Sequence, residues 1–288
     1  MIVLNAPGIA LTLLPERGGK ITSLLDVARQ REWLESAAHP LEGPPGDVAF
    51  DVGDMCGWDE MMPTIEACRY PGRDVALPDH GELWRRAWAV TQRSESSVTT
   101  RVAGATLPYR FERTLTLGPE SLRVEYRVSC DDDDICFLWA AHPLFRVRPG
   151  TRVVLDPSAY DFWPGVSESD RCSDGWPAAG VSVADDLAPG VSRKLFARSI
   201  TETATATLRD LDGTFLTLRW RHDDGPFVGL WLDHGAYARH AVVAIEPTNG
   251  PSDALDVAYA SGAAWSVSPG RPRHWTLELS LGQRRVEP

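Results

Sequence analysis

The 288-residue sequence is poor in cysteine and has no long hydrophobic run. Its five cysteines are odd in number and include no Cys-x-x-Cys pair, so they indicate neither a disulfide framework nor a zinc site, and we expect reduced thiols. The acidic run at 131–134 lacks the spaced ligands and the glycine of a calcium loop. The sequence therefore predicts no metal site.

Segments for membrane insertion or export are also missing. No stretch approaches the ~20 consecutive apolar residues that a transmembrane helix needs. Residues 1–5, MIVLN, lack the basic segment and the long apolar core of a signal peptide. We therefore expect a protein that enters no membrane, with the cytoplasm as its default location.

Basic residues are scarce relative to acidic ones. The chain has 29 Lys and Arg against 40 Asp and Glu, a formal net charge of −11. This excess argues against nucleic acid or an anionic membrane as the main partner and favours a neutral small molecule. No internal repeat and no composition break is visible, so the sequence favours one domain over residues 1–288. The sequence does not decide between a monomer and a homodimer.

Helical periodicity is nearly absent, and only residues 252–265 could hold a short helix. Elsewhere apolar and charged residues alternate, which is typical of half-buried strands with one face in water. The clearest cases are YRFE (109–112), LRVEYRV (122–128), LTLRWR (216–221) and WTLELSL (275–281). Several such strands joined by turns predict an all-β protein, an antiparallel sandwich or barrel with few short helices.

Two apolar runs end in an ionisable residue directly before a proline. VVAIEP (242–247) contains Glu246, and FLWAAHP (137–143) contains His142. A residue before proline favours extended geometry, and proline cannot donate to a strand ladder, so we expect both side chains at strand ends on a sheet rim. We interpret them as a general acid/base pair. The alternative is a solvated strand-end carboxylate and a packed, hydrogen-bonded histidine.

Two turn-rich stretches carry further polar and aromatic residues, GWDEMMP (57–63) and PDHGELW (78–84). Loops of this composition on a rigid scaffold are where binding sites usually lie. We therefore take His80 as a candidate site residue. The alternative is a histidine that caps or completes a turn.

Five stretches together resemble the aldose 1-epimerase (galactose mutarotase-like) family. In chain order they are PERGGKI (15–21), GWDEMMP (57–63), PDHGELW (78–84), HPLF (142–145) and IEPTNGPSDAL (245–255). They span nearly the whole chain, and their order and spacing make the match specific. The resemblance implies a large antiparallel β-sandwich, the galactose mutarotase-like supersandwich, with a sugar site on a concave sheet surface.

The resemblance also implies roles for three residues. His142 matches the family's general acid at the sugar ring oxygen, Glu246 its general base at the anomeric hydroxyl, and His80 its assisting histidine. The early arginine of the family has no clean counterpart, and the nearby candidates are Arg69, Arg73 and Arg85. The family's binding aspartate also stays open, between Asp161, Asp174 and Asp233.

The implied reaction interconverts the two anomers of an aldose. It removes the proton of the C1 hydroxyl while it protonates the ring oxygen, so one base and one acid suffice and we expect no cofactor. A carboxylate beside the histidine is expected to raise its pKa and so to favour the imidazolium. Tryptophan faces suit sugar C–H groups. The further sugar-binding candidates are Trp58, Asp79, Glu82, Trp84, Arg85, Trp163, Trp231 and Asp233.

Three other functions compete with a mutarotase for neutral sugars. A sugar-binding or regulatory protein could keep the fold without turnover, and the missing arginine favours it. An epimerase of a phosphorylated sugar needs clustered arginines near His80, and Arg85 with Arg86 keeps it open. A glycoside-processing enzyme needs two flanking carboxylates, but Glu246 has no acidic partner in an equivalent context.

Overall fold

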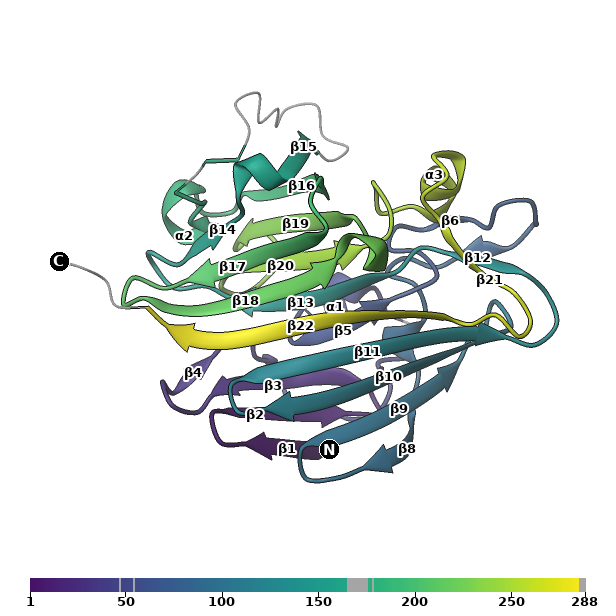
Figure 1. The fold of residues 1–288 in the computed structure, drawn as a ribbon, viewed down its shortest axis with the longest axis horizontal. Coiled ribbons are helices and arrows are strands. Elements are labelled where there is room, and N and C mark those ends of the chain that lie inside the picture. The colour runs from purple at the N-terminus through teal and green to yellow at the C-terminus, as the bar shows by residue number, and fades with distance from the viewer. Residues whose placement is uncertain (47, 54, 165–175, 178, 285–288) are drawn as a thin grey trace.

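The structure is a computed structural model that describes residues 1–46, 48–53, 55–164, 176–177 and 179–284. Within these residues two large antiparallel sheets pack against each other, one of ten strands and one of eight (Figure 1). Helical structure is confined there to three short α-helices and three 3₁₀ turns. The sequence-based prediction of an antiparallel β-sandwich with few short helices is confirmed.

The ten-stranded sheet combines N-terminal strands with strands from the middle and the second half of the chain. In spatial order its strands are β1 (Ile2–Ala6), β2 (Ile9–Leu14), β3 (Lys20–Asp26), β5 (Trp58–Met61), β13 (Ala140–Arg146), β20 (Ala241–Thr248), β19 (Phe227–His234), β16 (Ser192–Ser199) and β15 (Tyr160–Pro164), with β4 (Arg31–Glu32) beside β3.

The eight-stranded sheet packs on one face of this sheet. In spatial order its strands are β14 (Arg152–Val154), β17 (Thr203–Arg209), β18 (Thr214–Arg221), β22 (Arg273–Gln283), β11 (Ser121–Cys130), β10 (Tyr109–Gly118), β9 (Ser97–Ala103) and β8 (Ala89–Arg93).

Short elements complete the described fold. They are the strand pairs β6 (Cys68–Arg69) with β7 (Ala76–Leu77) and β12 (Ile135–Phe137) with β21 (Trp265–Val267), the helices α1 (Phe50–Gly53), α2 (Val183–Asp186) and α3 (Leu255–Ala260), and the 3₁₀ turns η1 (Leu83–Arg85), η2 (Pro157–Ala159) and η3 (His222–Asp224). The expected helix within 252–265 is present as α3. In the described ranges no helix is long and apolar enough to cross a membrane.

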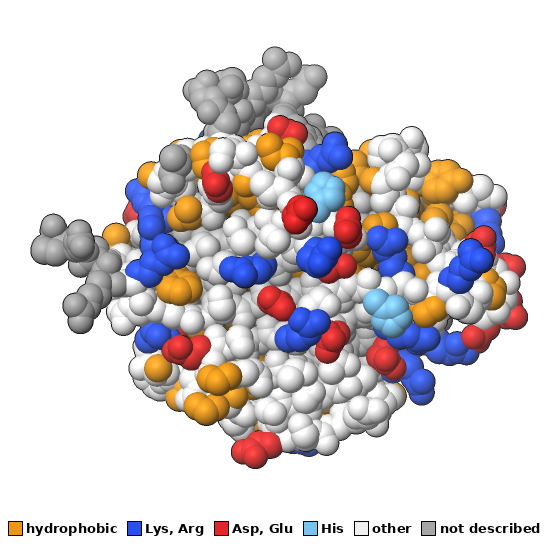
Figure 2. Space-filling view, in the orientation of Figure 1, with side chains coloured by type: hydrophobic (Ala, Val, Ile, Leu, Met, Phe, Trp, Pro, Cys, Tyr) orange, Lys and Arg blue, Asp and Glu red, His pale blue; other side chains and the backbone are white. Residues whose placement is uncertain are grey.

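The alternating segments form strands of the eight-stranded sheet, as their period predicts. In β11, Leu122, Val124 and Tyr126 point into the core, and the residues between them face outward. On the outer face Arg123 donates to Glu278 of β22 at 2.8 Å. Figure 2 shows Lys, Arg, Asp and Glu side chains interspersed over this face of the molecule. The period-two pattern therefore separates the shared core from the solvated side of the sheet.

A buried glutamate on β5 joins the two sheets. Glu60 Oε1 accepts hydrogen bonds from Arg113 Nη1 of β10 and from the Tyr126 hydroxyl of β11, both at 2.9 Å. Its other oxygen accepts from Trp139 Nε1 at 2.9 Å. Burial raises the pKa of Glu60, and the Arg113 guanidinium opposes that shift. This network compensates the carboxylate inside the apolar sandwich.

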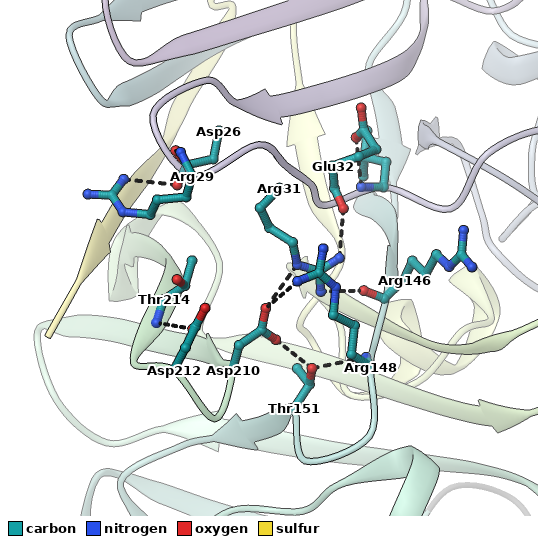
Figure 3. Close-up of polar contacts among 11 residues, drawn as sticks. Asp26, Arg29, Arg31, Glu32, Arg146, Arg148, Thr151, Asp210, Asp212 and Thr214 are labelled. Carbon is teal, nitrogen blue, oxygen red and sulfur yellow. Dashed lines mark hydrogen bonds and ion pairs between the residues drawn. The ribbon is translucent and has the colours of Figure 1, made fainter. Parts of the chain in front are cut away.

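A second polar network ties the sheets together elsewhere (Figure 3). Arg31, at the start of β4, donates from Nε to Asp210 Oδ2 at 3.0 Å and from Nη2 to the Arg146 carbonyl at 2.9 Å. Asp210 directly follows β17 and also accepts from the Thr151 hydroxyl. The contacts link an edge of the ten-stranded sheet to a strand end of the eight-stranded sheet.

The ten-stranded sheet uses its two faces differently. On β13 and β20, Phe145, Val243 and Ile245 point into the core between the sheets. Side chains alternate along each strand, so the alternate residues of β13 and β20, including His142 and Glu246, point to the opposite face. That outer face also carries a small apolar cluster separate from the main core, made of Leu144, Ala238, Val242 and Ala244. The candidate site lies on this face.

We predict that removing the cation of the Glu60 network destabilises the fold strongly. Arg113→Met leaves a buried carboxylate uncompensated, which typically costs about 3–5 kcal/mol. The matched control is Arg123→Met, which removes an exposed arginine from the same sheet and should cost much less. Urea unfolding followed by tryptophan fluorescence measures both. Equal losses in the two variants would contradict the role assigned to this network.

Candidate active site

A cavity of about 540 Å³ opens on the outer face of the ten-stranded sheet. Its floor comes from β13, β20, β19 and β16, and its walls come from α1 and the loops around residues 65, 80 and 253. The described lining residues are Phe50, Asp51, Met55, Ile65, Glu66, Asp79, His80, His142, Ser192, Lys194, Trp231, Tyr237, Glu246 and Asp253.

His142 and Glu246 face each other across neighbouring strands. Ala140 pairs with Thr248 and Leu144 with Ala244, which places His142 of β13 opposite Glu246 of β20. Their Nε2 and Oε1 atoms are 3.8 Å apart. The side chains are only 7% and 1% exposed, so both groups act in a largely desolvated environment.

The prediction that these residues end their strands is wrong. Both lie inside strands, because β13 continues to Arg146 and β20 to Thr248. The ladder between β13 and β20 lacks regular pairs between Ala140 and Leu144, where each strand has a proline without an N–H. The prolines thus interrupt the hydrogen bonding locally and leave the strand direction unchanged.

The two oxygens of the Glu246 carboxylate have different surroundings. Oε2 accepts a hydrogen bond from Lys194 Nζ at 2.6 Å. The same ammonium lies 3.3 Å from Asp253 Oδ1. Oε1 is buried, faces His142, and accepts no hydrogen bond from any described residue. One oxygen is therefore held by the protein and the other is available to a ligand.

His80 approaches His142 from a loop. Its backbone adopts a positive φ of 56°, which turns the side chain toward the cavity. Its ring stacks on Phe50 with centroids 4.2 Å apart and planes 11° apart, and lies 5.9 Å from the His142 ring. Phe50 also packs edge-on against His142 at 5.5 Å. Phe50 thus contacts both imidazoles.

Asp79 orients the imidazole ring of His80. His80 Nδ1 lies 2.6 Å from Asp79 Oδ2, so it donates to the carboxylate and leaves Nε2 as the second polar atom of the ring. This hydrogen bond from His80 lowers the pKa of Asp79 and keeps its carboxylate ionised.

The pKa of His142 is shifted in the direction opposite to the one expected from sequence. Burial lowers it well below its ordinary value, and electrostatic interactions with His80, Lys194 and Lys20 lower it further. The expectation considered only the carboxylate of Glu246, and the cations could not be seen in the sequence. His142 is therefore predominantly neutral at pH 7.

Lys194 stays charged although it lies in the cavity floor. Burial alone would lower its pKa, but the carboxylates of Asp253 and Glu246 outweigh burial and raise it. Burial raises the pKa of Asp253, and the Lys194 charge opposes this shift. The three residues therefore form one charged cluster. In the part of the chain that the structure describes, no group of three His, Cys, Asp or Glu side chains is arranged to hold a metal ion.

The structure brings together five of the residues predicted from sequence. His80, His142, Glu246, Asp79 and Trp231 all line the cavity. Trp231 also packs against Tyr237, an exposed residue at the rim, with ring centroids 6.0 Å apart. These two rings form an aromatic wall on one side.

Five other predicted binding residues are not among the described lining, and their side chains have structural contacts instead. Trp58 and Trp84 are fully buried in the core. Glu82 accepts from the Ala105 and Thr106 amides and from the Tyr109 hydroxyl, so it anchors a loop. Asp233 is buried and accepts from the amides of the turn that follows it, at Gly235, Tyr237 and Ala238. Arg85 lies over the Trp84 ring at 4.7 Å.

The remaining candidates lie elsewhere or outside the described part. Arg69 forms an exposed ion pair with Asp74, and Arg73 lies 3.4 Å from Asp133. Asp161 is exposed on β15. The backbone of Trp163 belongs to β15, but its side chain and all of Asp174 fall outside the described residues.

Lys194 and Asp253 are the charged lining residues nearest to Glu246 that the sequence analysis missed. Asp253 lies within the quoted stretch IEPTNGPSDAL and could have been found there as a polar residue close to Glu246. Lys194 lies in SRKLFARS, which has no recognisable motif, and only the strand order brings it to the site.

Comparison with protein-family models finds no match, and no curated protein matches the chain either. Solved structures match over nearly its whole length. They include a galactose mutarotase related enzyme from Lactobacillus acidophilus, with 16% identity, a TM-score of 0.75, and coverage of 99% of this chain and 98% of that one. A galactose mutarotase-like protein from Lactobacillus casei has 20% identity, a TM-score of 0.74, and coverage of 98% and 100%.

A third solved structure agrees with these two. A galactose mutarotase-like protein from Clostridium acetobutylicum is 14% identical, with a TM-score of 0.75 over 98% of this chain and 95% of that one. At such identities the likeness concerns the fold. The chain therefore has the galactose mutarotase-like fold, as the resemblance in its sequence implies.

We predict that the His142 imidazole titrates below its ordinary value of about 6.5. Because the folded-state pKa is lowered, the unfolded chain binds more protons once the pH falls below about 6.5, and the free energy of unfolding decreases there. Two-dimensional ¹H–¹⁵N NMR of the imidazole nitrogens measures the titration, with His142→Gln assigning the signal. A midpoint at or above the ordinary value would contradict the electrostatic description of the site.

Proposed function

We propose that the protein is an aldose 1-epimerase, a mutarotase that interconverts the α and β anomers of a neutral aldose. The observation that carries this proposal is the pair of His142 and Glu246, whose Nε2 and Oε1 atoms lie 3.8 Å apart in a cavity of the galactose mutarotase-like fold. The reaction requires one base and one acid on neighbouring oxygens of a sugar. The pair supplies both groups.

In this proposal Glu246 Oε1 accepts the proton of the C1 hydroxyl. Protonated His142 gives its Nε2 proton to the ring oxygen, and the bond from C1 to the ring oxygen breaks. The products are the free aldehyde, a hydroxyl on the former ring oxygen, protonated Glu246 and neutral His142. Rotation about the C1–C2 bond and reversal of these steps on the other face give the second anomer.

The reactive state thus contains one proton that is shared by the pair. The proton lies on His142 before the ring opens and on Glu246 afterwards, and ring closure returns it. The lowered pKa of His142 makes the imidazolium scarce at pH 7 but a stronger acid when it forms. The carboxylate opposite stabilises this form.

The other lining residues suit the recognition of a sugar. In this proposal His80 uses the nitrogen that does not contact Asp79 for a hydroxyl of the sugar. The faces of Trp231 and Tyr237 offer apolar contact to its C–H groups. Sugar sites combine such apolar surfaces with a few convergent polar groups.

The charges around the cavity favour a neutral sugar over a phosphorylated one. The described lining contains the carboxylates of Asp51, Glu66, Asp79, Glu246 and Asp253. Among the described lining residues Lys194 is the one lysine or arginine, and the carboxylates of Glu246 and Asp253 neutralise its charge. Arg85 was the sequence-based reason to consider an epimerase of a phosphorylated sugar, but its guanidinium lies over the Trp84 ring. A phosphate group would therefore meet net negative charge.

We predict that Glu246→Gln abolishes catalysis while it spares sugar binding. The amide has nearly the same shape but cannot accept the hydroxyl proton, so the rate should fall by about 10²-fold or more. Polarimetry of freshly dissolved α-anomers of glucose and galactose measures turnover, and tryptophan fluorescence measures binding. His142→Asn should lose most activity too. Glu125→Gln, an exposed carboxylate on the eight-stranded sheet, is the control. Near-normal turnover in Glu246→Gln would refute the assignment.

We predict that a phosphate group on the sugar weakens catalysis. With net negative charge around the cavity, kcat/KM for glucose 6-phosphate should be lower than for glucose by about tenfold or more, which corresponds to about 1.4 kcal/mol. Raising the ionic strength should narrow the gap, because salt screens the repulsion. A preference for the phosphorylated sugar would show that the substrate class is wrong.

A further inference from the structure

We propose that Lys194 is a positioning residue that assigns different roles to the two oxygens of Glu246. The ammonium of Lys194 contacts both Glu246 Oε2 and the Asp253 carboxylate. It thereby leaves Glu246 Oε1 as the one oxygen of this carboxylate that faces His142 and the substrate. This inference deepens the proposed function and rests on it. We call the contact of Lys194 with Glu246 and Asp253 the lysine bridge.

The bridge depends on a glycine in the strand that it crosses. β19 lies between β16, which carries Lys194, and β20, which carries Glu246. On β19, Trp231 pairs with Lys194, while Gly229 pairs with Glu246, so the lysine reaches Glu246 diagonally over Gly229. A Cβ atom at Gly229 would lie 3.1 Å from Glu246 Oε2 and 3.2 Å from Lys194 Nζ. The missing side chain therefore makes room for the bridge.

Asp253 fixes the other end of the bridge. Its carboxylate lies 3.3 Å from Lys194 Nζ. Its backbone carbonyl accepts from the Ile65 and Glu66 amides at 2.9 and 2.8 Å, so the loop that carries it is anchored to the neighbouring loop around residue 65. Lys194 consequently connects the floor strands with a fixed loop and has little freedom to move away from Glu246.

The bridge makes the two carboxylate oxygens chemically unequal. Glu246 is fully buried, and a buried carboxylate requires compensation. Lys194 supplies that compensation at Oε2 through a charge-assisted hydrogen bond of 2.6 Å. Oε1 has no hydrogen-bond partner among the described residues. A sugar hydroxyl at Oε1 would satisfy it.

The same lysine acts on His142 through space. The charged and titratable groups around His142 come from several elements: Glu246 on β20, Lys194 on β16, Lys20 and Asp59 on β3 and β5, His80 and Asp79 on the loop before η1, and Asp253 on the loop after β20. Lys194 opposes protonation of His142, whereas Glu246 favours it. Without the lysine charge, the repulsion of the His142 imidazolium by Lys194 is lost, and the attraction by Glu246 becomes stronger.

The test replaces Lys194 by an apolar side chain of similar length. In Lys194→Met we expect the NMR titration midpoint of His142 to move to higher pH by about one unit or more. The alkaline limb of the pH–rate profile should move in the same direction, and kcat should fall by about 10-fold to 100-fold while KM stays within about threefold. Lys194→Arg keeps the charge and should restore most of kcat. Arg193→Met, an exposed position on the other face of β16, should leave both readouts unchanged.

Gly229→Ala tests the bridge without removing the lysine. Its Cβ would crowd both Nζ and Oε2 and force them to shift. We therefore expect changes in kcat and in the His142 titration in the same direction as in Lys194→Met, but smaller. If Lys194→Met does not fold, Gly229→Ala takes its place as the test of the lysine bridge. An unchanged His142 titration together with wild-type kcat in Lys194→Met, or in Gly229→Ala if the former is unfolded, would overturn the inference.

The titration separates this inference from the proposed function. If the wild-type protein does not accelerate anomer exchange but Lys194→Met still shifts the His142 titration, the bridge stands and the proposed function is wrong. If the wild-type protein is active and Lys194→Met changes neither kcat nor the titration, the proposed function stands and the role of Lys194 is wrong.

Discussion

The burial of the Glu246 carboxylate on the outer face of a sheet is the constraint on which the site depends. A carboxylate that is 1% exposed must be compensated by the groups around it, and Lys194 does so at one oxygen only. The second oxygen then faces the His142 imidazole at 3.8 Å. Because the strands also bury Val243 and Ile245 in the core between the sheets, the outer residues cannot shift without disturbing the sandwich.

The fold was predictable because its signal is local. In residues 122–128 each apolar residue is followed by a polar one, and this period of two appears in the structure as the inner and outer faces of β11. The order of the strands could not be read in this way, because pairing depends on contacts between distant segments. β13 lies between β5 and β20, for example, and no local pattern in the chain indicates these neighbours.

The candidate site was predictable only in part, for the same reason. His142 and Glu246 were found from their repeated context before proline. The pKa of His142, however, depends first on burial in the folded protein and then on His80, Lys194 and Lys20, which lie far away in the chain. Lys194 itself carries no motif. Trp58 was placed in the site wrongly, because its stretch was expected to be a loop but residues 58–61 form β5, on which Trp58 is buried in the core.

In the proposed reaction Glu246 and His142 move protons between oxygens of the sugar, and no C–H bond breaks. Exchange NMR of an equilibrated aldose in D₂O tests it directly, because cross-peaks between the two anomeric protons report ring opening and the C2 proton reports any carbon acid chemistry. We predict cross-peaks that grow with protein concentration while the C2 proton is fully retained. Loss of that proton to deuterium at the rate of anomer exchange, or no cross-peaks above the level of spontaneous mutarotation, would contradict this mechanism.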